Sequence, residues 1–338
     1  MQWVVAIIGV GASLQLISLV PAGIFIGLHQ NIKWVLNQST ARILTLVALY
    51  IYSVNGAGIL ECAIILSLGS VIIVPFSFAT LWLKDRDFNL SAITTKEKFK
   101  EIANYCTTMG FWNASVLLIG GISTTLVGIF DPKSVGSYAL AVTAINVTNG
   151  VLLAILSPIG VNSAALMTEK DGSLQVKKIL FKSTKILTRI LISGIICYSL
   201  IGKIILTYWV GNDYAAEADS YLIILLFANC IRNMLLPLSM ILLAIRDPKI
   251  GLKATIFEGV VVLLSSVLLG SKYGALGIAA ATIFGAVAGA AFSAKYVMNE
   301  LSDVVGSRLD FLINSIARPS LIFIPLIVLT VFLAFGHG

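Results

Sequence analysis

Charged and catalytically versatile side chains are scarce in this sequence. Of its 338 residues, 12% are Asp, Glu, Lys or Arg and two are His, whereas 58% are hydrophobic. The mean hydropathy is +0.98. Soluble domains carry about 25% charged residues, so this composition excludes an ordinary soluble domain. It indicates an integral membrane protein.

Motifs for metal, disulfide and nucleotide binding are lacking. The four cysteines lie in or beside apolar runs without CxxC spacing, and His29 and His337 are far apart. This spacing provides no metal-ligand set, no disulfide framework and no His-based catalytic group. The glycines between residues 267 and 281 lack the Lys-Ser/Thr ending of a phosphate-binding P-loop. We therefore expect no metal, no cofactor and no catalytic residue.

The sequence also has no long polar loop. The longest polar stretches begin at Lys84, Met167 and Lys295, and none is long enough for an independent domain. On the opposite side of the membrane the main loop is short, VGNDYAAEADS. A membrane glycan polymerase would be expected to present charged groups in a larger external loop. The loop lengths therefore disfavour an enzyme.

Long apolar runs are what the sequence has in abundance. A helix needs about 20 apolar residues to cross roughly 30 Å of hydrocarbon, whereas strands of a membrane barrel alternate in polarity over about ten residues. The runs predict an all-α, polytopic membrane helix bundle of about ten transmembrane helices. They are residues 4–28, 41–54, 58–83, 107–130, 135–160, 186–208, 220–245, 254–270, 273–296 and 318–336.

The placement of charge predicts an orientation. Nineteen of the 23 Lys and Arg residues fall in alternate loops, and the opposite loops hold only Lys133, Lys203 and Lys272. The positive-inside rule puts the nineteen in the cytoplasm, so the net charge of +7 does not indicate nucleic acid. Ten helices then place both termini outside. Because an exported N-terminus without a signal peptide is unusual, we expect an odd number of further helices before Met1.

An internal repeat divides the chain into two related bundles. Residues 19–69 align without gaps with residues 235–285, and Pro21 meets Pro237. Apolar composition alone is the alternative explanation for this match. The offset spans six crossings, so the copies would be related by an axis along the membrane normal. If each bundle has six helices, three helices are missing from the first.

These features predict four parts. They are an incomplete N-terminal bundle (1–84), a cytoplasmic amphipathic linker (85–106), a C-terminal bundle (107–300) and an additional C-terminal helix (301–338). In the linker, Thr94 and Glu97 form a capping box before a basic helix. That helix is predicted to lie on the anionic inner leaflet, and a solvated basic face is the alternative.

Arg232 is the only basic residue outside the loops and their margins. It lies about 12 residues from each end of its run, or roughly 18 Å along a helix. A charge at this depth costs about 2.5–3.5 kcal/mol, so it should face a wet cavity or an acid. A cavity would suit a phosphate-bearing ligand. The alternative is pairing with Glu258 or Glu61, which lie near run ends and are expected at other depths.

Further polar residues lie deep within the apolar runs. Hydrogen bonding between helices is one explanation for such residues. The other is that they line the path of a sugar. The predicted substrate-cavity residues are Arg232, Asn229, Asn233, Asn113, Thr125, Asn146 and Asn149.

Two segments resemble a known family. Residues 135–160 resemble the Gly-x-Tyr entry and proline-ended helix of polysaccharide flippases, and residues 206–226 resemble their Trp-x-Gly-x-x-Tyr segment through Trp209, Gly211 and Tyr214. The family is the Wzx-type lipid-linked oligosaccharide flippases, within the multidrug/oligosaccharidyl-lipid/polysaccharide exporter superfamily. On its template of two six-helix bundles, the helices of this chain look like four to thirteen.

The resemblance implies a function and partners. An undecaprenyl-diphosphate-linked oligosaccharide would cross the bacterial cytoplasmic (inner) membrane by alternating access, for surface polysaccharides such as O-antigen. Membrane lipid and other polysaccharide assembly proteins are the implied partners. One alternative is a cation-coupled multidrug exporter, disfavoured because no acid is expected at mid-membrane. Another is an inactive, truncated transporter, since the first helices normally build much of one cavity wall.

Overall fold

The structure is helical throughout its described part. The computed structural model describes residues 2–18, 21, 24–25, 31–82, 96–246 and 249–321, and every regular element in these ranges is a helix. The predicted all-α, polytopic fold is therefore confirmed. The chain divides into two units, Met1–Thr94 and Thr95–Gly338, which are described separately.

The described part of the first unit contains three helices of 14 to 24 residues. They are α1 (Gln2–Gln15, extended by the 3-10 turn η1, Leu16–Ser18), α3 (Asn31–Val54) and α4 (Ile59–Trp82). Helix α4 packs against both α1 and α3. At these contacts Gly11 faces Ser67 and Gly69 faces Thr45 so closely that an added Cβ would overlap the neighbour. Small residues of this kind let membrane helices approach each other.

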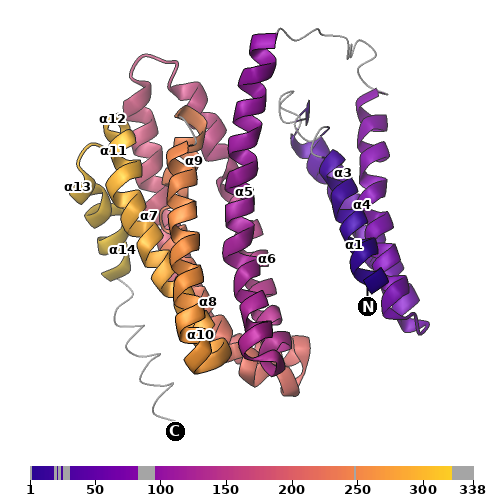
Figure 1. Cartoon of the computed structure of the whole chain (residues 1–338). Coiled ribbons are helices and arrows are strands. Elements are labelled where there is room, and N and C mark those ends of the chain that lie inside the picture. Colours follow the sequence, from indigo (N-terminus) through magenta and orange to yellow (C-terminus); the bar gives the residue numbers. More distant parts are fainter. Residues whose placement is uncertain are drawn as a thin grey trace. The chain divides into compact units, whose positions relative to one another are not determined.

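The described part of the second unit begins with five helices and a short 3-10 turn before a long hairpin, and Figure 1 shows their arrangement. These elements are α5 (Lys96–Phe130), η2 (Pro132–Ser134), α6 (Val135–Leu166), α7 (Gly172–Val210), α8 (Asn212–Asn233), α9 (Leu236–Ile245) and α10 (Lys249–Phe292).

Helix α10 is a hairpin of two helical arms. Its chain reverses at Gly274, whose φ of 59° and ψ of −140° are not helical. Across the turn Gly270 meets Ile278, Gly285 meets Val262, and the Ser265 hydroxyl donates to the carbonyl of Ala281. The arms therefore run antiparallel, as Figure 1 shows. They correspond to the predicted runs 254–270 and 273–296.

Short helices follow and pack on the N-terminal part of α7. Val176 and Leu180 of α7 are buried there among residues 297–311 and side chains of α9. The short elements are the π-helical turn η3 (Ser293–Val297), α11 (Met298–Glu300), α12 (Ser302–Val305), α13 (Arg308–Leu312), the π-helical turn η4 (Ile313–Ala317) and α14 (Arg318–Leu321).

The chain is a multi-pass membrane protein. Five segments of the described residues are long and apolar enough to cross a membrane, and the last of them contains both arms of α10. Two shorter apolar helices, Ile119–Phe130 and Leu236–Ile245, accompany them. The five segments are Ile59–Thr80, Pro132–Leu166, Gly172–Val210, Asn212–Asn233 and Lys249–Glu300. The total of ten crossings and their orientation stay predictions.

The predicted single helix over residues 220–245 is wrong. Helix α8 ends at Asn233, two residues form a turn, and α9 begins at Leu236. Pro237 explains the break, because it has no N–H to donate to the carbonyl of Asn233 and its ring does not fit inside a continuous helix. Arg232 consequently lies in the last turn of α8 rather than mid-helix.

Some predicted features fall outside the described residues. Residues 85–95 of the predicted linker, among them Thr94, do so, as do residues 322–338 of the last run. From Lys96 onward, the rest of the linker and the run 107–130 form one continuous helix, α5. The predicted boundaries of the four parts stay predictions.

Candidate functional site

A cavity of about 470 Å³ lies within the second unit. Side chains of α5, α6, α8, α9, α10 and η3 line it. Its volume falls within the range of small-molecule pockets, about 300–1,000 Å³. The wall is mostly apolar. Its polar side chains are Ser123, Tyr138, Asn146, Asn149, Arg232, Asn233, Ser239, Thr255, Glu258, Thr282 and Ser293.

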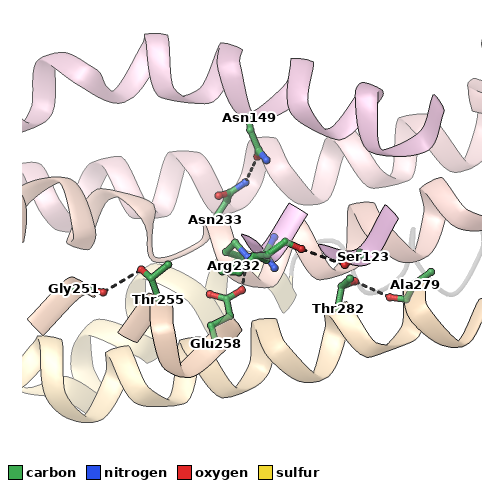
Figure 2. Close-up of polar contacts among 10 residues, drawn as sticks. Ser123, Asn149, Arg232, Asn233, Gly251, Thr255, Glu258, Ala279 and Thr282 are labelled. Carbon is green, nitrogen blue, oxygen red and sulfur yellow. Dashed lines mark hydrogen bonds and ion pairs between the residues drawn. The ribbon is translucent and has the colours of Figure 1, made fainter. Parts of the chain in front are cut away.

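Arg232 projects into this cavity from the end of α8. Its Nε–H donates to Oε1 of Glu258 over 2.5 Å, and the two side chains are 29% and 10% exposed. Figure 2 shows this pair with the surrounding polar groups. Both partners line the cavity. The arginine is therefore paired with an acid and faces a cavity at once, although the sequence had presented these as alternatives.

Glu258 lies deeper in its helix than the sequence suggested. The first arm of α10 begins at Lys249, five residues before the predicted run, so Glu258 lies nine residues inside it. On the second arm Gly289 leaves space for the carboxylate, since an added Cβ there would lie 2.7 Å from Oε2. The expectations that Glu258 lies at another depth, and that no acid lies beside Arg232 within the membrane, are wrong.

The guanidinium of Arg232 keeps unused donors. A guanidinium has five N–H groups, and Glu258 accepts from the one on Nε. The Nη2 atom is buried and has no hydrogen-bond partner among the described residues. Leaving a buried donor unsatisfied costs about 1–3 kcal/mol, and more for a charged group. An oxyanion in the cavity could satisfy these donors through the planar fork of the guanidinium.

Two asparagines join α6 and α8 at the cavity wall. Asn233 Nδ2 donates to Oδ1 of Asn149 over 2.8 Å. Asn146, one turn earlier on α6, lines the same cavity and is exposed. Together with Arg232, four of the seven predicted cavity residues meet here.

Of the other three predicted residues, Asn229 and Thr125 do not line the cavity. Asn229 is buried at 2% exposure, and its Oδ1 has no partner among the described residues. Thr125 is exposed and donates to the carbonyl of Gly121 on its own helix. The side chain of Asn113 lies outside the described part of the structure. Substrate binding by these seven residues stays a prediction.

Several cavity residues had no clear signal in the sequence. The hydroxyls of Ser123, Thr255 and Thr282 donate to backbone carbonyls of their own helices. A Ser or Thr whose hydroxyl bonds to its own helix gives the same sequence pattern whether it faces lipid or a cavity. Within the described residues no group of three or more His, Cys, Asp or Glu side chains could hold a metal ion.

Comparison with known proteins finds a match in fold to a solved structure. A search of family models and a search of curated proteins found no match. A solved structure of the lipid II flippase MurJ, in an inward closed conformation, matches with a TM-score of 0.65 and 14% sequence identity. The match covers 95% of this chain and 71% of the flippase chain. At this identity the likeness shows the fold alone, a polytopic helical membrane fold.

Proposed function

We propose that this chain moves an undecaprenyl-diphosphate-linked oligosaccharide across the bacterial cytoplasmic membrane, by alternating access and without chemical change to the cargo. The oligosaccharide would serve surface polysaccharide synthesis, as the resemblance to Wzx-type flippases implies. Other polysaccharide assembly proteins would then be its partners. In this role the protein is a transporter rather than an enzyme.

The observation that carries this proposal is that Nη2 of Arg232, a residue lining the cavity, is buried and has no hydrogen-bond partner among the described residues. A diphosphate presents several oxyanions, and the free edge of the guanidinium offers donors in the matching plane. Glu258 accepts from the neighbouring Nε–H, which fixes the plane of the guanidinium. Hydrogen bonds to charged groups are worth about 1.5–3 kcal/mol each. Arg232 would therefore contribute substantially to binding a diphosphate.

The rest of the wall suits a glycan attached to that diphosphate. Asn146 and Asn149 provide amide groups, and Ser239 adds a hydroxyl from α9. Amides and hydroxyls can both donate to and accept from sugar hydroxyls. The solved structure with this fold is named a lipid II flippase. A lipid-linked cargo for this chain agrees with that name.

A transport assay in vesicles tests the proposal. Vesicles containing the protein and a fluorescent undecaprenyl-diphosphate glycan should move the glycan between leaflets. Arg232→Ala should abolish the movement, and Arg232→Lys should retain part of it, because lysine keeps the charge but not the planar fork. Lys203→Ala, which removes an exposed cation of α7, is the control. Full movement by Arg232→Ala at equal protein content would contradict the proposal.

A cation-coupled multidrug exporter is the second candidate, favoured by one observation. Glu258 is a nearly buried carboxylate that lines the cavity, and such a group can bind a proton or cation. Its pairing with Arg232 speaks for the first proposal, because the pair already neutralises the carboxylate. In the same vesicles, cation-driven dye movement without glycan movement would support the exporter and contradict the flippase.

A further inference from the structure

A basic stripe runs along the N-terminal part of α7. It consists of Lys178, Lys182, Lys185 and Arg189, all of them exposed. Their spacing of four, three and four residues places them on one narrow face of the helix, within about 60° at 100° per residue. The four charges span roughly 17 Å along the helix axis.

The opposite face of α7 is fixed by packing. Val176 and Leu180 are fully buried against α9 and residues 297–311, and Leu187 is buried against α6 and α8. On a helical wheel these three residues lie diametrically opposite the stripe. The helix therefore cannot turn the stripe inward without exposing its buried face, and the stripe points away from the unit.

The stripe has no counter-charge within the described chain. None of its four cations forms an ion pair or hydrogen bond with a described residue, in contrast to Arg232 with Glu258 and Arg246 with Asp303. Neighbouring Lys177 belongs to another face, where its Nζ lies 5.7 Å from the centre of the Phe181 ring. Like charges four residues apart destabilise a helix. Anionic groups from outside the chain would relieve that repulsion.

The stripe ends where the apolar part of α7 begins. Residues 190–210 contain a single charged residue, Lys203, and span about 31 Å, which matches roughly 30 Å of hydrocarbon. Arg189 thus lies at the hydrocarbon boundary, with Lys185 about 6 Å and Lys182 about 10 Å beyond it. The headgroup layer is about 5–8 Å thick on each side. Electrostatic attraction to its phosphates extends about 8 Å farther, the Debye length at physiological salt. Exposed Ile186 and Ile190 flank this end of the stripe.

We propose that the basic stripe is a binding site for the headgroups of anionic phospholipids. The cations and the headgroup phosphates are complementary in charge, and the stripe reaches the boundary at which those phosphates lie. Binding of a soluble anionic partner would not explain why the stripe ends at the hydrocarbon boundary. None of the four residues lines the cavity around Arg232, so this site is separate from the proposed transport site.

Two triple variants test the site with the same loss of charge. The first is Lys182→Gln/Lys185→Gln/Arg189→Gln. The control is Lys133→Gln/Lys203→Gln/Lys272→Gln, which also removes three exposed cations. The purified full chain in neutral detergent is titrated with phosphatidylglycerol or with zwitterionic phosphatidylcholine. Native mass spectrometry then counts the bound lipids.

The wild type and the control should retain phosphatidylglycerol in preference to phosphatidylcholine. Each cation near an anionic membrane surface contributes a roughly fivefold factor, so the first triple variant should bind phosphatidylglycerol on the order of 100-fold more weakly. Lys178→Gln should have less effect than Arg189→Gln, because it lies farther from the boundary. Binding of phosphatidylglycerol by the wild type should also weaken as salt is raised.

Three results would overturn the proposal. One is equal retention of phosphatidylglycerol by the wild type and the first triple variant. Another is an equal loss in both triple variants, which would show attraction to net charge alone. The third is thermal stabilisation of the wild type by inorganic phosphate as large as that by phosphatidylglycerol, which would assign the stripe to free anions. Because the wild-type salt and phosphate measurements need no variant, the test holds even if a triple variant fails to fold.

Discussion

At the scale of single residues, Arg232 has three reasons for its position. It lies in the last turn of α8, where the negative end of the helix dipole favours a cation. Glu258 accepts a hydrogen bond from its Nε. The side chain also lines a cavity that could hold an anion, and its Nη2 has no partner among the described residues. The first two reasons lower the cost of a charge in the membrane, and the third relates to function.

Gly289 permits the ion pair, and its substitution should break it. In Gly289→Ala the new Cβ would lie 2.7 Å from Oε2 of Glu258, so the carboxylate must move away from Arg232. Overpacking of this kind lowers the free energy of unfolding by about 1–3 kcal/mol. Thermal denaturation in detergent measures the loss, and the vesicle assay should show reduced glycan movement.

Gly259→Ala is the matched control for Gly289→Ala. Gly259 neighbours Glu258, and a Cβ there would meet Ile119 at an ordinary 3.5 Å. The helix should tolerate this alanine or gain up to about 1 kcal/mol from its better helix propensity. Equal melting temperatures for the two variants would show that Gly289 does not make room for the carboxylate.

At the scale of elements, the reversal at Gly274 brings Glu258 and Gly289 together. The φ of 59° at Gly274 is one that residues with a Cβ rarely adopt. Asp131 lies beside this turn and accepts a hydrogen bond from the Ala275 N–H over 3.3 Å. The turn is therefore held by a glycine conformation and by a carboxylate from the loop between α5 and α6.

Substitution of Gly274 should destabilise the hairpin. In Gly274→Ala the backbone strain costs about 1–3 kcal/mol. The added Cβ would also lie 2.9 Å from Asp131 Oδ2. The melting temperature should fall clearly. Gly128→Ala, where a Cβ finds only Val135 at 3.8 Å, should leave it unchanged or raise it. An unchanged melting temperature in Gly274→Ala would mean that the turn does not limit stability.

Apolar runs predicted where most described helices lie, because burial in lipid requires continuous hydrophobic residues. They could not show that α5 and α7 continue well beyond the apolar part, to Lys96 and Gly172. The end of α7 packs against α9 and residues 297–311 through Val176 and Leu180, and an apolar run does not report such packing. The break before Pro237 was visible as a proline, but an apolar run alone does not tell a kinked helix from two helices.

At the scale of the whole molecule, the second unit gathers polar side chains from helices far apart in the sequence. Arg232, Asn233, Asn146 and Asn149 could be predicted, because amides and charges are rare within apolar runs. The role of Glu258 could not, since its depth depends on where α10 begins and how its two arms align. Tertiary packing sets both, and no local pattern reports them.

The cavity also relates the fold to the proposed function. A fold by itself names neither a function nor a cargo, and the fold match here rests on 14% identity. The chemistry of the cavity is what favours a diphosphate over an uncharged drug. The central claim is therefore that Arg232 recognises the diphosphate of a lipid-linked cargo.

Binding of undecaprenyl diphosphate to the purified protein tests this claim most directly. The wild type should bind the lipid saturably, and Arg232→Ala should bind it on the order of 10- to 100-fold more weakly, as expected for loss of a charged hydrogen-bond donor. Arg246→Ala, which removes the exposed pair with Asp303, should bind like the wild type. Equal dissociation constants for the wild type and Arg232→Ala would contradict the account.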